Sequence, residues 1–116
     1  MADNKKTGDY GERLAAEYLS GKGYIIIEKK FRCRTGEIDI IASDDDYYVF
    51  VEVKLRRNLS KGYPREAVGY AKQVKIRKTA LGYLSLHGVA EADMRFDVIE
   101  IIGADTVTIE HIENAF

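Results

Sequence analysis

Residues 36–54, which read GEIDIIASDDDYYVFVEVK, carry the clearest structural signal in this chain. Both ends of the stretch are rich in β-branched and aromatic residues, which favour β-strands. The three aspartates in its middle, at 44–46, are typical of a turn. The stretch therefore predicts two strands, over 36–43 and 47–55, that are joined as a hairpin.

The two faces of this hairpin differ sharply in polarity. With a two-residue turn at 45–46, Asp39 lies opposite Glu52 and Glu37 lies opposite Lys54. A one-residue shift in the turn changes these pairs but leaves the alternation along each strand intact. These four charged side chains share one face, at the end away from the turn. The other face is apolar and consists of Ile38, Ile40, Ala42, Val49, Val51 and Val53.

The charged cluster has the chemistry of a metal site. Directly opposite residues have Cβ atoms about 5 Å apart. Two carboxylates at that distance repel each other, so one takes up a proton or both share a cation. Oxygen ligands with room for water suit Mg²⁺ or Mn²⁺.

Lys54 projects to the same side of its strand as Glu52. An ammonium group there can position or deprotonate a metal-bound water and offset the charge that builds on a phosphate. The pattern therefore predicts metal-assisted phosphodiester hydrolysis. The alternative is a solvated strand face with an ion pair between Glu37 and Lys54.

The rest of the chain predicts further elements around the hairpin. We expect helices over 9–20 and 64–86, and strands over 24–31, 94–102 and 107–112. The helical crossover favours parallel pairing of the fourth strand with one of the first three. The sequence thus predicts one α/β domain over 1–116, a mixed sheet flanked by helices, with residues 1–7 as a frayed, disordered terminus.

Periodicity gives each predicted helix an inner face. Asp9 and Glu12 at the start of the first helix have the spacing of a capping box. The inner face of that helix consists of Leu14, Ala15, Tyr18 and Leu19. The inner face of the second helix consists of Ala67, Ala71, Val74, Ala80, Leu81 and Leu84. We interpret three tyrosines as packing residues, with stacking on bases as the alternative: Tyr63, Tyr70 and Tyr83.

The composition of the 116 residues excludes several classes of protein. The single cysteine, Cys33, rules out an internal disulfide, and the two histidines lie too far from it for zinc-site spacing. There is no Walker loop, serine-hydrolase elbow or Rossmann fingerprint. No apolar run approaches the roughly 20 residues of a membrane helix, and the first residues lack the apolar stretch of a signal peptide. We therefore expect a cytoplasmic protein without membrane association.

Basic residues are concentrated in one part of the chain. The net charge is −1, yet residues 54–78 hold nine basic side chains and one acidic, which leaves −9 on the rest. Screening limits the reach of charges to about 8 Å at physiological salt, so such a zone can attract a polyanion locally. We expect Arg56, Arg57, Lys72 and Lys75 to bind nucleic acid. The alternative is a solvated loop and helix face.

Two motifs in the hairpin resemble a known nuclease signature. Gly36-Glu37-Ile38-Asp39 followed by Val51-Glu52-Val53-Lys54 resembles the PD-(D/E)xK pattern, with Ile38 in place of its proline. More closely, the chain resembles the YraN-like family of small bacterial restriction-endonuclease-like proteins, which are also similar to archaeal Holliday-junction resolvases. The resemblance covers most of the chain and extends to Gly8-x-x-Gly11-Glu12, Gly23-Tyr24, Phe50, Lys72 and Arg95-Phe96-Asp97.

This resemblance implies both a fold and a set of site residues. The implied fold is a restriction-endonuclease-like αβββαβ core, here with an extra C-terminal strand. The implied catalytic residues are Asp39, Glu52 and Lys54. Asp39, Glu52 and the carbonyl of Val53 are the implied ligands of Mg²⁺ or Mn²⁺. Glu12 is implied as a third metal-binding acid, and helix capping is the alternative role for it.

Two main functional hypotheses follow from these patterns. The first is a Mg²⁺- or Mn²⁺-dependent endonuclease that hydrolyses DNA, including branched DNA such as Holliday junctions. The second is a non-catalytic nucleic-acid-binding module on the same fold, which binds in a salt-sensitive way without a metal. A third hypothesis is a protein-interaction domain that uses the charge asymmetry to form a homodimer. The sequence leaves three questions open: whether the substrate is DNA or RNA, whether it is branched or linear, and how many metal ions are bound.

Overall fold

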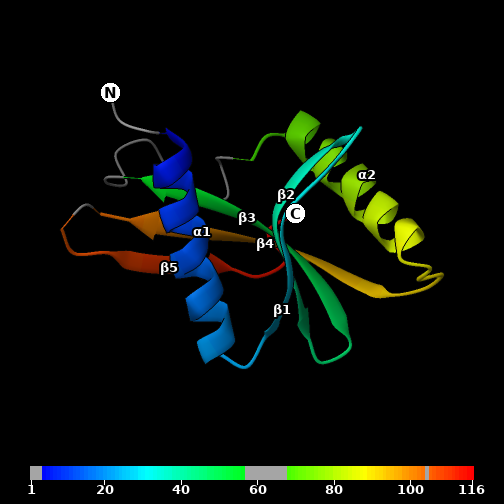
Figure 1. Cartoon of the computed structure of the whole chain (residues 1–116), viewed down its shortest axis with the longest axis horizontal. Helices are drawn as coiled ribbons and strands as arrows, with labels where there is room; N and C mark the ends of the chain where they lie inside the picture. The colour runs from blue at the N-terminus through cyan, green and yellow to red at the C-terminus, as the bar shows by residue number, and fades with distance from the viewer. Residues whose placement is uncertain (1–3, 57–67, 104) are drawn as a thin grey trace.

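A computed structural model describes residues 4–56, 68–103 and 105–116 of the chain (Figure 1). The elements in chain order are α1 (Asn4–Gly21), β1 (Ile25–Cys33), β2 (Gly36–Asp44), β3 (Tyr47–Arg56), α2 (Tyr70–Leu86), β4 (Asp93–Ile102) and β5 (Thr108–Ile112). The predicted order of helices and strands is confirmed. Neither helix has an apolar stretch long enough to cross a membrane, as far as the described residues extend.

The strands form one mixed sheet in the order β1-β2-β3-β4-β5. β3 and β4 pair in parallel, and every other neighbouring pair is antiparallel. α2 precedes β4 in the chain and forms the crossover that parallel pairing requires. The predicted fold class is therefore confirmed: a mixed sheet flanked by helices, with β5 added to an αβββαβ arrangement.

Each face of the sheet carries its own hydrophobic core. Val49 and Val51 of β3 belong to the cluster around α1, whereas Phe50 between them belongs to the cluster around α2. Because side chains alternate along a strand, α1 and α2 cover opposite faces of the sheet. On the α1 side, the cluster also contains Ala15, Ala16, Leu19, Tyr24, Ile40, Ala42, Ile99 and Ile101. On the α2 side, it also contains Phe31, Ile38, Ile41, Val68, Ile76, Ala80, Tyr83, Leu84, Phe96 and Val98.

The predicted apolar face of the hairpin is confirmed except at Ile38. The other five residues pack on the α1 side, but Ile38 lies in the α2 cluster. Residues two apart on a regular strand share a face. The separation of Ile38 from Ile40 therefore shows that β2 departs from regular alternation at Asp39, which lies between them.

Helix α1 begins five residues earlier than predicted. It starts at Asn4, so residues 4–7, which we expected to be frayed, are helical. Asp9 consequently lies inside the helix, and the capping-box interpretation of Asp9 and Glu12 is wrong. The carboxylate of Asp9 instead pairs with Lys30 of β1. The predicted inner face of this helix is confirmed, with Ala15 and Leu19 fully buried.

Helix α2 begins at Tyr70, six residues after the predicted start at Pro64, which lies outside the described residues. Gly69 is its N-cap residue, and Gln73 donates its side-chain amide to the Val68 carbonyl at 3.0 Å. The predicted inner face is wrong at Ala71 and Leu81, which are exposed. The helix is turned so that its buried residues are Ile76, Thr79, Ala80, Tyr83 and Leu84.

Two of the tyrosines interpreted as packing residues fall within the described structure. Tyr83 is buried, with its ring 5.1 Å from that of Phe31 and 6.3 Å from that of Phe50. These ring contacts hold α2 in the orientation that leaves Leu81 in solvent. Tyr70 is exposed at the first turn of α2, so its packing interpretation is wrong. Tyr63 lies outside the described residues.

The turn between β1 and β2 packs closely against the middle of α2. Gly36 has a φ of +152°, a backbone angle that residues with a Cβ atom rarely adopt. A Cβ atom at Gly36 would lie 3.1 Å from the Thr79 hydroxyl oxygen and 3.9 Å from the Lys75 Cβ. The hydroxyls of Thr35 and Thr79 are 2.9 Å apart and share a hydrogen bond. A glycine at 36 therefore lets α2 lie directly over the start of β2.

Candidate active site

The candidate site forms where β2 separates from β3. The two strands pair from Asp44 and Tyr47 as far as Ile40 and Val51. Beyond that point β2 stays paired with β1, and β3 stays paired with β4. The two-residue turn and the predicted register are confirmed, since Ile40 lies opposite Val51. The ladder ends one step before the expected pairs of Asp39 with Glu52 and Glu37 with Lys54, so these two pairs do not form between the strands.

Asp39 bridges the opening with its side chain instead of its backbone. Its Oδ2 atom accepts a hydrogen bond of 2.8 Å from the backbone N–H of Val53. A carboxylate oxygen thus takes the place of a ladder carbonyl at the first unpaired step. This contact holds the Asp39 carboxylate beside β3, next to Glu52.

The opening contains a cavity of about 380 Å³ between β2, β3 and α2. The residues that line it are Gly36, Glu37, Asp39, Glu52, Val53, Lys54, Lys72, Lys75 and Ile76. Six of the predicted site residues therefore meet there: Asp39, Glu52, Val53, Lys54, Lys72 and Lys75. A larger cavity of about 610 Å³ lies around the other end of α2 and contains none of them.

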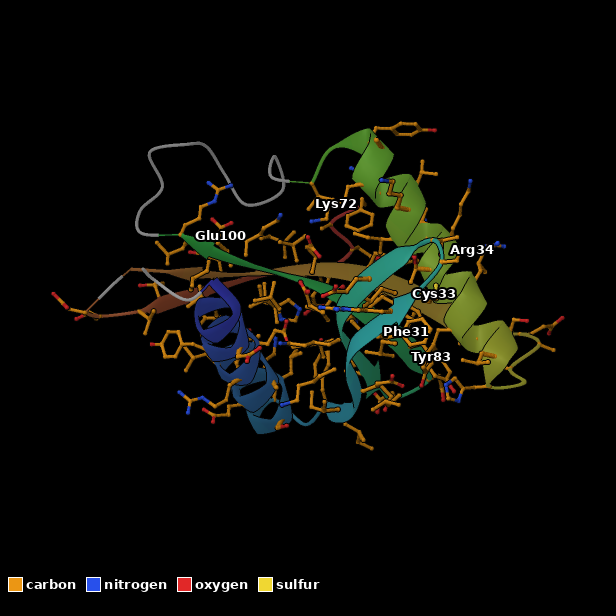
Figure 2. All side chains as sticks on the ribbon, turned by 45° about the horizontal axis from the view of Figure 1, so that its top comes forward. Phe31, Cys33, Arg34, Lys72, Tyr83 and Glu100 are labelled. Atoms are coloured by element: carbon orange, nitrogen blue, oxygen red, sulfur yellow. The ribbon has the colours of Figure 1, made fainter. Side chains whose placement is uncertain are left out.

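Glu52 is the electrostatic centre of this cavity. Its side chain is only 6% exposed, and two lysines compensate its charge. The Lys72 ammonium contacts the Glu52 Oε2 atom directly, and the Lys54 Nζ atom lies 3.4 Å from the same oxygen. Burial alone would lower the pKa of Lys72, but the contact with Glu52 outweighs burial and raises it. Figure 2 places Lys72 on the first turns of α2.

Asp39 has the most altered acidity in the cavity. Burial, together with the negative charge of Glu52, raises the pKa of Asp39 to about 7. The hydrogen bond from Val53 acts in the opposite direction but does not outweigh them. The two carboxylates therefore repel each other when both are ionised, and a proton on one of them or a cation between them reduces that repulsion.

The donor set of the cavity suits a hard divalent cation. Asp39 and Glu52 offer carboxylate oxygens, and neither imidazole nor thiol groups line the cavity. Across the described part of the chain, no three His, Cys, Asp or Glu side chains converge as a metal-binding group. A cation held here would consequently have two carboxylates, completed by backbone oxygen and water.

Glu12 lies on α1, on the opposite side of the sheet from α2, and does not line the cavity. Its negative charge nevertheless reaches Asp39, where it adds to burial and to the charge of Glu52 in raising the pKa. Its side chain is buried, and burial raises its pKa although the charge of Lys30 opposes that shift. Glu37 does line the cavity, but it pairs with Arg32, 2.9 Å away, rather than with Lys54.

The four predicted nucleic-acid-binding residues have different surroundings. Lys72 and Lys75 line the cavity. Arg56 is 16% exposed, with its Nε atom 3.0 Å from the Glu100 Oε2 atom, so an internal acid already engages its guanidinium group. Arg57 lies outside the described residues.

Glu100 is a charged residue that the sequence patterns did not identify. It is fully buried and lies opposite Lys54 in the parallel register of β3 and β4. Burial raises its pKa, and the positive charge of Arg56 opposes this shift. An acid inside the apolar run Val98–Ile102 was the available signal. Its relation to Lys54 depends on a strand register that local patterns do not reveal.

A second buried polar network lies on the other side of the sheet. Arg95 donates to both carboxylate oxygens of Asp97, at 3.0 and 2.9 Å, and to Asp44 at 3.0 Å. Asp97 also contacts His111 at 2.7 Å. Burial would raise the pKa of Asp97, but the hydrogen bonds from His111 and Arg95 outweigh it and lower the pKa. These mutual contacts join β2, β4 and β5 and give Arg95 a structural role.

Comparison with known proteins identifies the family of the chain. Residues 11–101 match the uncharacterised protein family UPF0102. A UPF0102 protein of Clostridium acetobutylicum is 48% identical, over 97% of this chain and 95% of the relative. UPF0102 proteins of Geotalea uraniireducens and Caldanaerobacter subterraneus are also 48% identical, over 92% and 97% of their own lengths. The matched region contains every residue of the cavity, and the chain therefore belongs to the uncharacterised protein family UPF0102.

Proposed function

We propose that this chain is a metal-dependent nuclease that hydrolyses phosphodiester bonds in DNA. The observation that carries the proposal is the pair of acids at the opening of the sheet. Asp39 and Glu52 come from two separating strands and face one cavity with Lys54, and burial together with the negative charge of Glu52 raises the pKa of Asp39 to about 7. Such a pair, beside an ammonium group, suits the binding of a divalent cation and a phosphate.

Four residues of the cavity have a role in this proposal. Asp39, Glu52 and the carbonyl of Val53 would hold Mg²⁺ or Mn²⁺, which when bound supplies a water activated for attack on phosphorus. Lys54 would orient that water and offset the negative charge that develops on the phosphate. Lys54 suits this role because its Nζ atom lies only 3.4 Å from a Glu52 carboxylate oxygen.

The resemblance to the YraN-like group supports DNA as the substrate and the cytoplasm as the location. It also supports branched DNA, since that group is similar to Holliday-junction resolvases. The relatives matched above bear no functional name, so they add nothing to the choice of substrate. The proposal therefore depends on the chemistry of the cavity and on the motifs at Gly36–Asp39 and Val51–Lys54.

A second candidate is a nucleic-acid-binding module without hydrolysis. The observation that favours it is the compensation of Glu52 by two lysines, Lys72 and Lys54. With its charge already balanced, Glu52 has less need of a metal ion. This candidate predicts binding that depends on salt but not on a divalent cation.

A cleavage assay separates the two candidates. Labelled four-way junction, linear duplex and single-stranded DNA would each be incubated with Mg²⁺, Mn²⁺ or EDTA and resolved on a denaturing gel. The test variants are Asp39→Asn, which keeps an oxygen to accept the Val53 N–H, and Lys54→Ala. Lys29→Ala serves as the control, because it removes an exposed lysine that does not line the cavity.

We expect metal-dependent cleavage by the wild type and by the control. In both test variants the cleavage rate should fall by about 10²-fold or more. Equal cleavage by all four proteins would place the active site elsewhere. No cleavage of any substrate, combined with salt-sensitive binding in EDTA, would favour the binding module.

A further inference from the structure

Several basic side chains near the cavity are already engaged by acids. Arg32 pairs with Glu37 at 2.9 Å, and Arg56 pairs with the buried Glu100 at 3.0 Å. Lys54 and Lys72 both approach Glu52. A phosphate that binds to any of these groups must compete with an internal carboxylate, so they are poor candidates for the first contact with a polyanion.

Three other cations near the cavity have no such partner. Arg34, Lys75 and Lys78 are exposed, and no acid pairs with any of them within residues 4–56, 68–103 and 105–116. Arg34 lies outside the basic segment 54–78 that the sequence indicates. Only the folded chain relates it to the lysines of α2.

The fold brings these three cations to one side of the molecule. The turn that carries Arg34 packs on α2 through the hydrogen bond between Thr35 and Thr79, and the Cys33 Sγ atom lies 4.0 Å from the Cβ position of Gly82. Figure 2 shows Arg34 and Cys33 beside α2. Lys75 and Lys78 are three residues apart, so they are neighbours on the helix surface.

This arrangement also continues into the cavity. Lys75 lines the cavity, and its Cβ atom lies 3.9 Å from the Cβ position of Gly36. At 1.5 Å of rise per residue, the helix between Lys72 and Lys78 covers about 9 Å. That length corresponds to about two or three nucleotide steps of 3.4 Å along one DNA strand.

We propose that Arg34, Lys75 and Lys78 form a cationic surface that holds the phosphate backbone of double-stranded DNA and leads it to the cavity. The inference rests on the proposed function, because it takes DNA as the partner. It adds Arg34 and Lys78 as contacts and replaces Arg56, which is engaged by Glu100. Backbone contacts of this kind are independent of sequence and strongly dependent on salt.

The test measures DNA binding without cleavage. Fluorescence anisotropy with a labelled linear duplex in EDTA would be recorded over a series of salt concentrations. The double variant Arg34→Gln/Lys78→Gln would be compared with wild type and with Arg13→Gln/Lys29→Gln. The control removes the same charge from exposed residues on α1 and β1, which do not line the cavity. Circular dichroism would verify that all three proteins are folded.

We expect Arg34→Gln/Lys78→Gln to bind about tenfold more weakly and to lose about 2 from the slope of log K against log salt, because two phosphate contacts are removed. The control should match the wild type. Three results would each contradict the proposed DNA-binding surface. They are equal binding by the test variant and the wild type, an equal loss of binding in the control, and no binding by the wild type.

The outcome is independent of the nuclease test. Cleavage that requires Asp39, together with normal binding by Arg34→Gln/Lys78→Gln, would reject the surface and leave the nuclease proposal standing. Absence of cleavage, together with selective weakening by Arg34→Gln/Lys78→Gln, would reject the nuclease and support the surface on a binding module.

Discussion

Among single residues, Asp39 shows best how the fold alters chemistry. The residue lies at the irregular step of β2, accepts a hydrogen bond from Val53 and faces Glu52. Burial and the neighbouring charge favour its protonated form, so it is an uncommonly weak acid for an aspartate. If β2 and β3 were paired along their full length and the acids lay in solvent, Asp39 would have the ordinary pKa of an aspartate, 3.8.

The acidity of Asp39 leads to a pH dependence of stability. The pKa is about 7 in the folded protein, against an ordinary value of 3.8. Between these values the folded state binds more protons than the unfolded state, so the contribution of Asp39 to stability is full below about pH 4 and is lost as pH rises to about 7. At 1.36 kcal/mol per pKa unit, the full loss is about 4 kcal/mol, of which about 3 kcal/mol falls between about pH 5 and about pH 8. Urea unfolding in EDTA at about pH 5 and about pH 8 would measure it.

Asp39→Asn should remove the contribution of Asp39, because asparagine does not titrate and keeps an acceptor for Val53. It should leave only the contributions of Glu12 and Glu100, whose pKa values burial also raises. Glu91→Gln, at an exposed residue outside the cavity, should retain the contribution of Asp39. If Asp39→Asn lost stability with rising pH as steeply as the wild type, the altered acidity would belong to another group.

Asp97 provides a contrasting residue on the other side of the sheet. It is fully buried and accepts hydrogen bonds from Arg95, from His111 at 2.7 Å and from the Asn114 N–H at 3.1 Å. These contacts lower its pKa, so they stabilise the protein above the ordinary pKa of an aspartate and are lost as pH falls. Asp97→Ala should cost about 3–5 kcal/mol, because the buried Arg95 charge is left with fewer partners.

Urea unfolding near neutral pH would measure the effect of Asp97→Ala. Asp93→Ala is the matched control, because Asp93 is an exposed aspartate on the same strand. A change below about 1 kcal/mol, the level of an exposed ion pair, would show that the network contributes little to stability.

Among the elements, the contact of α2 with the turn between β1 and β2 determines the shape of the cavity. Gly36→Ala would place a methyl group 3.1 Å from the Thr79 hydroxyl oxygen at a φ of +152°. We expect it to destabilise the protein by about 1–3 kcal/mol, because both the backbone strain and the contact are unfavourable. Thermal unfolding followed by circular dichroism would measure the change.

Gly21→Ala is the control for this substitution. Gly21 ends α1, and no atom lies within 4 Å of its Cβ position. Its replacement should leave stability unchanged or slightly improve it, since alanine restricts the unfolded chain. An equal loss of stability in both variants would mean that the close approach of α2 is not responsible.

The elements also show which parts of the fold local patterns predict. The period of two in Ile38–Ala42 and Val49–Val53, with the aspartates between, correctly predicted the hairpin and its turn. The opening of the ladder at Asp39 was not predictable, because it results from β2 following β1 while β3 follows β4. Glu100 was missed for a related reason: its place opposite Lys54 depends on pairing across the α2 crossover.

At the scale of the whole molecule, the candidate site lies at the boundary between two parts of one sheet. β1 and β2 form an antiparallel pair on one side of the opening, and β3, β4 and β5 continue together on the other. α2 packs over both, through Thr79 near the turn and through Lys72 at Glu52. A cation held by Asp39 and Glu52 would therefore connect the two parts.

This arrangement predicts that a divalent cation stabilises the whole fold. A ligand at 100 times its dissociation constant adds about 2.7 kcal/mol to the free energy of unfolding. At about 4 °C per kcal/mol for a domain of this size, the midpoint of thermal unfolding should rise by about 10 °C. Calorimetry with Mn²⁺, with Mg²⁺ and with EDTA would measure the shift.

The matched variants are Asp39→Asn/Glu52→Gln and Glu91→Gln. The first removes both carboxylates from the cavity and should abolish the shift, while the second removes an exposed carboxylate elsewhere and should keep it. A shift that survives in Asp39→Asn/Glu52→Gln would come from cations bound at other carboxylates. No shift in the wild type would mean that Lys72 and Lys54, which both contact the Glu52 Oε2 atom, already compensate this carboxylate and leave a metal little to gain there.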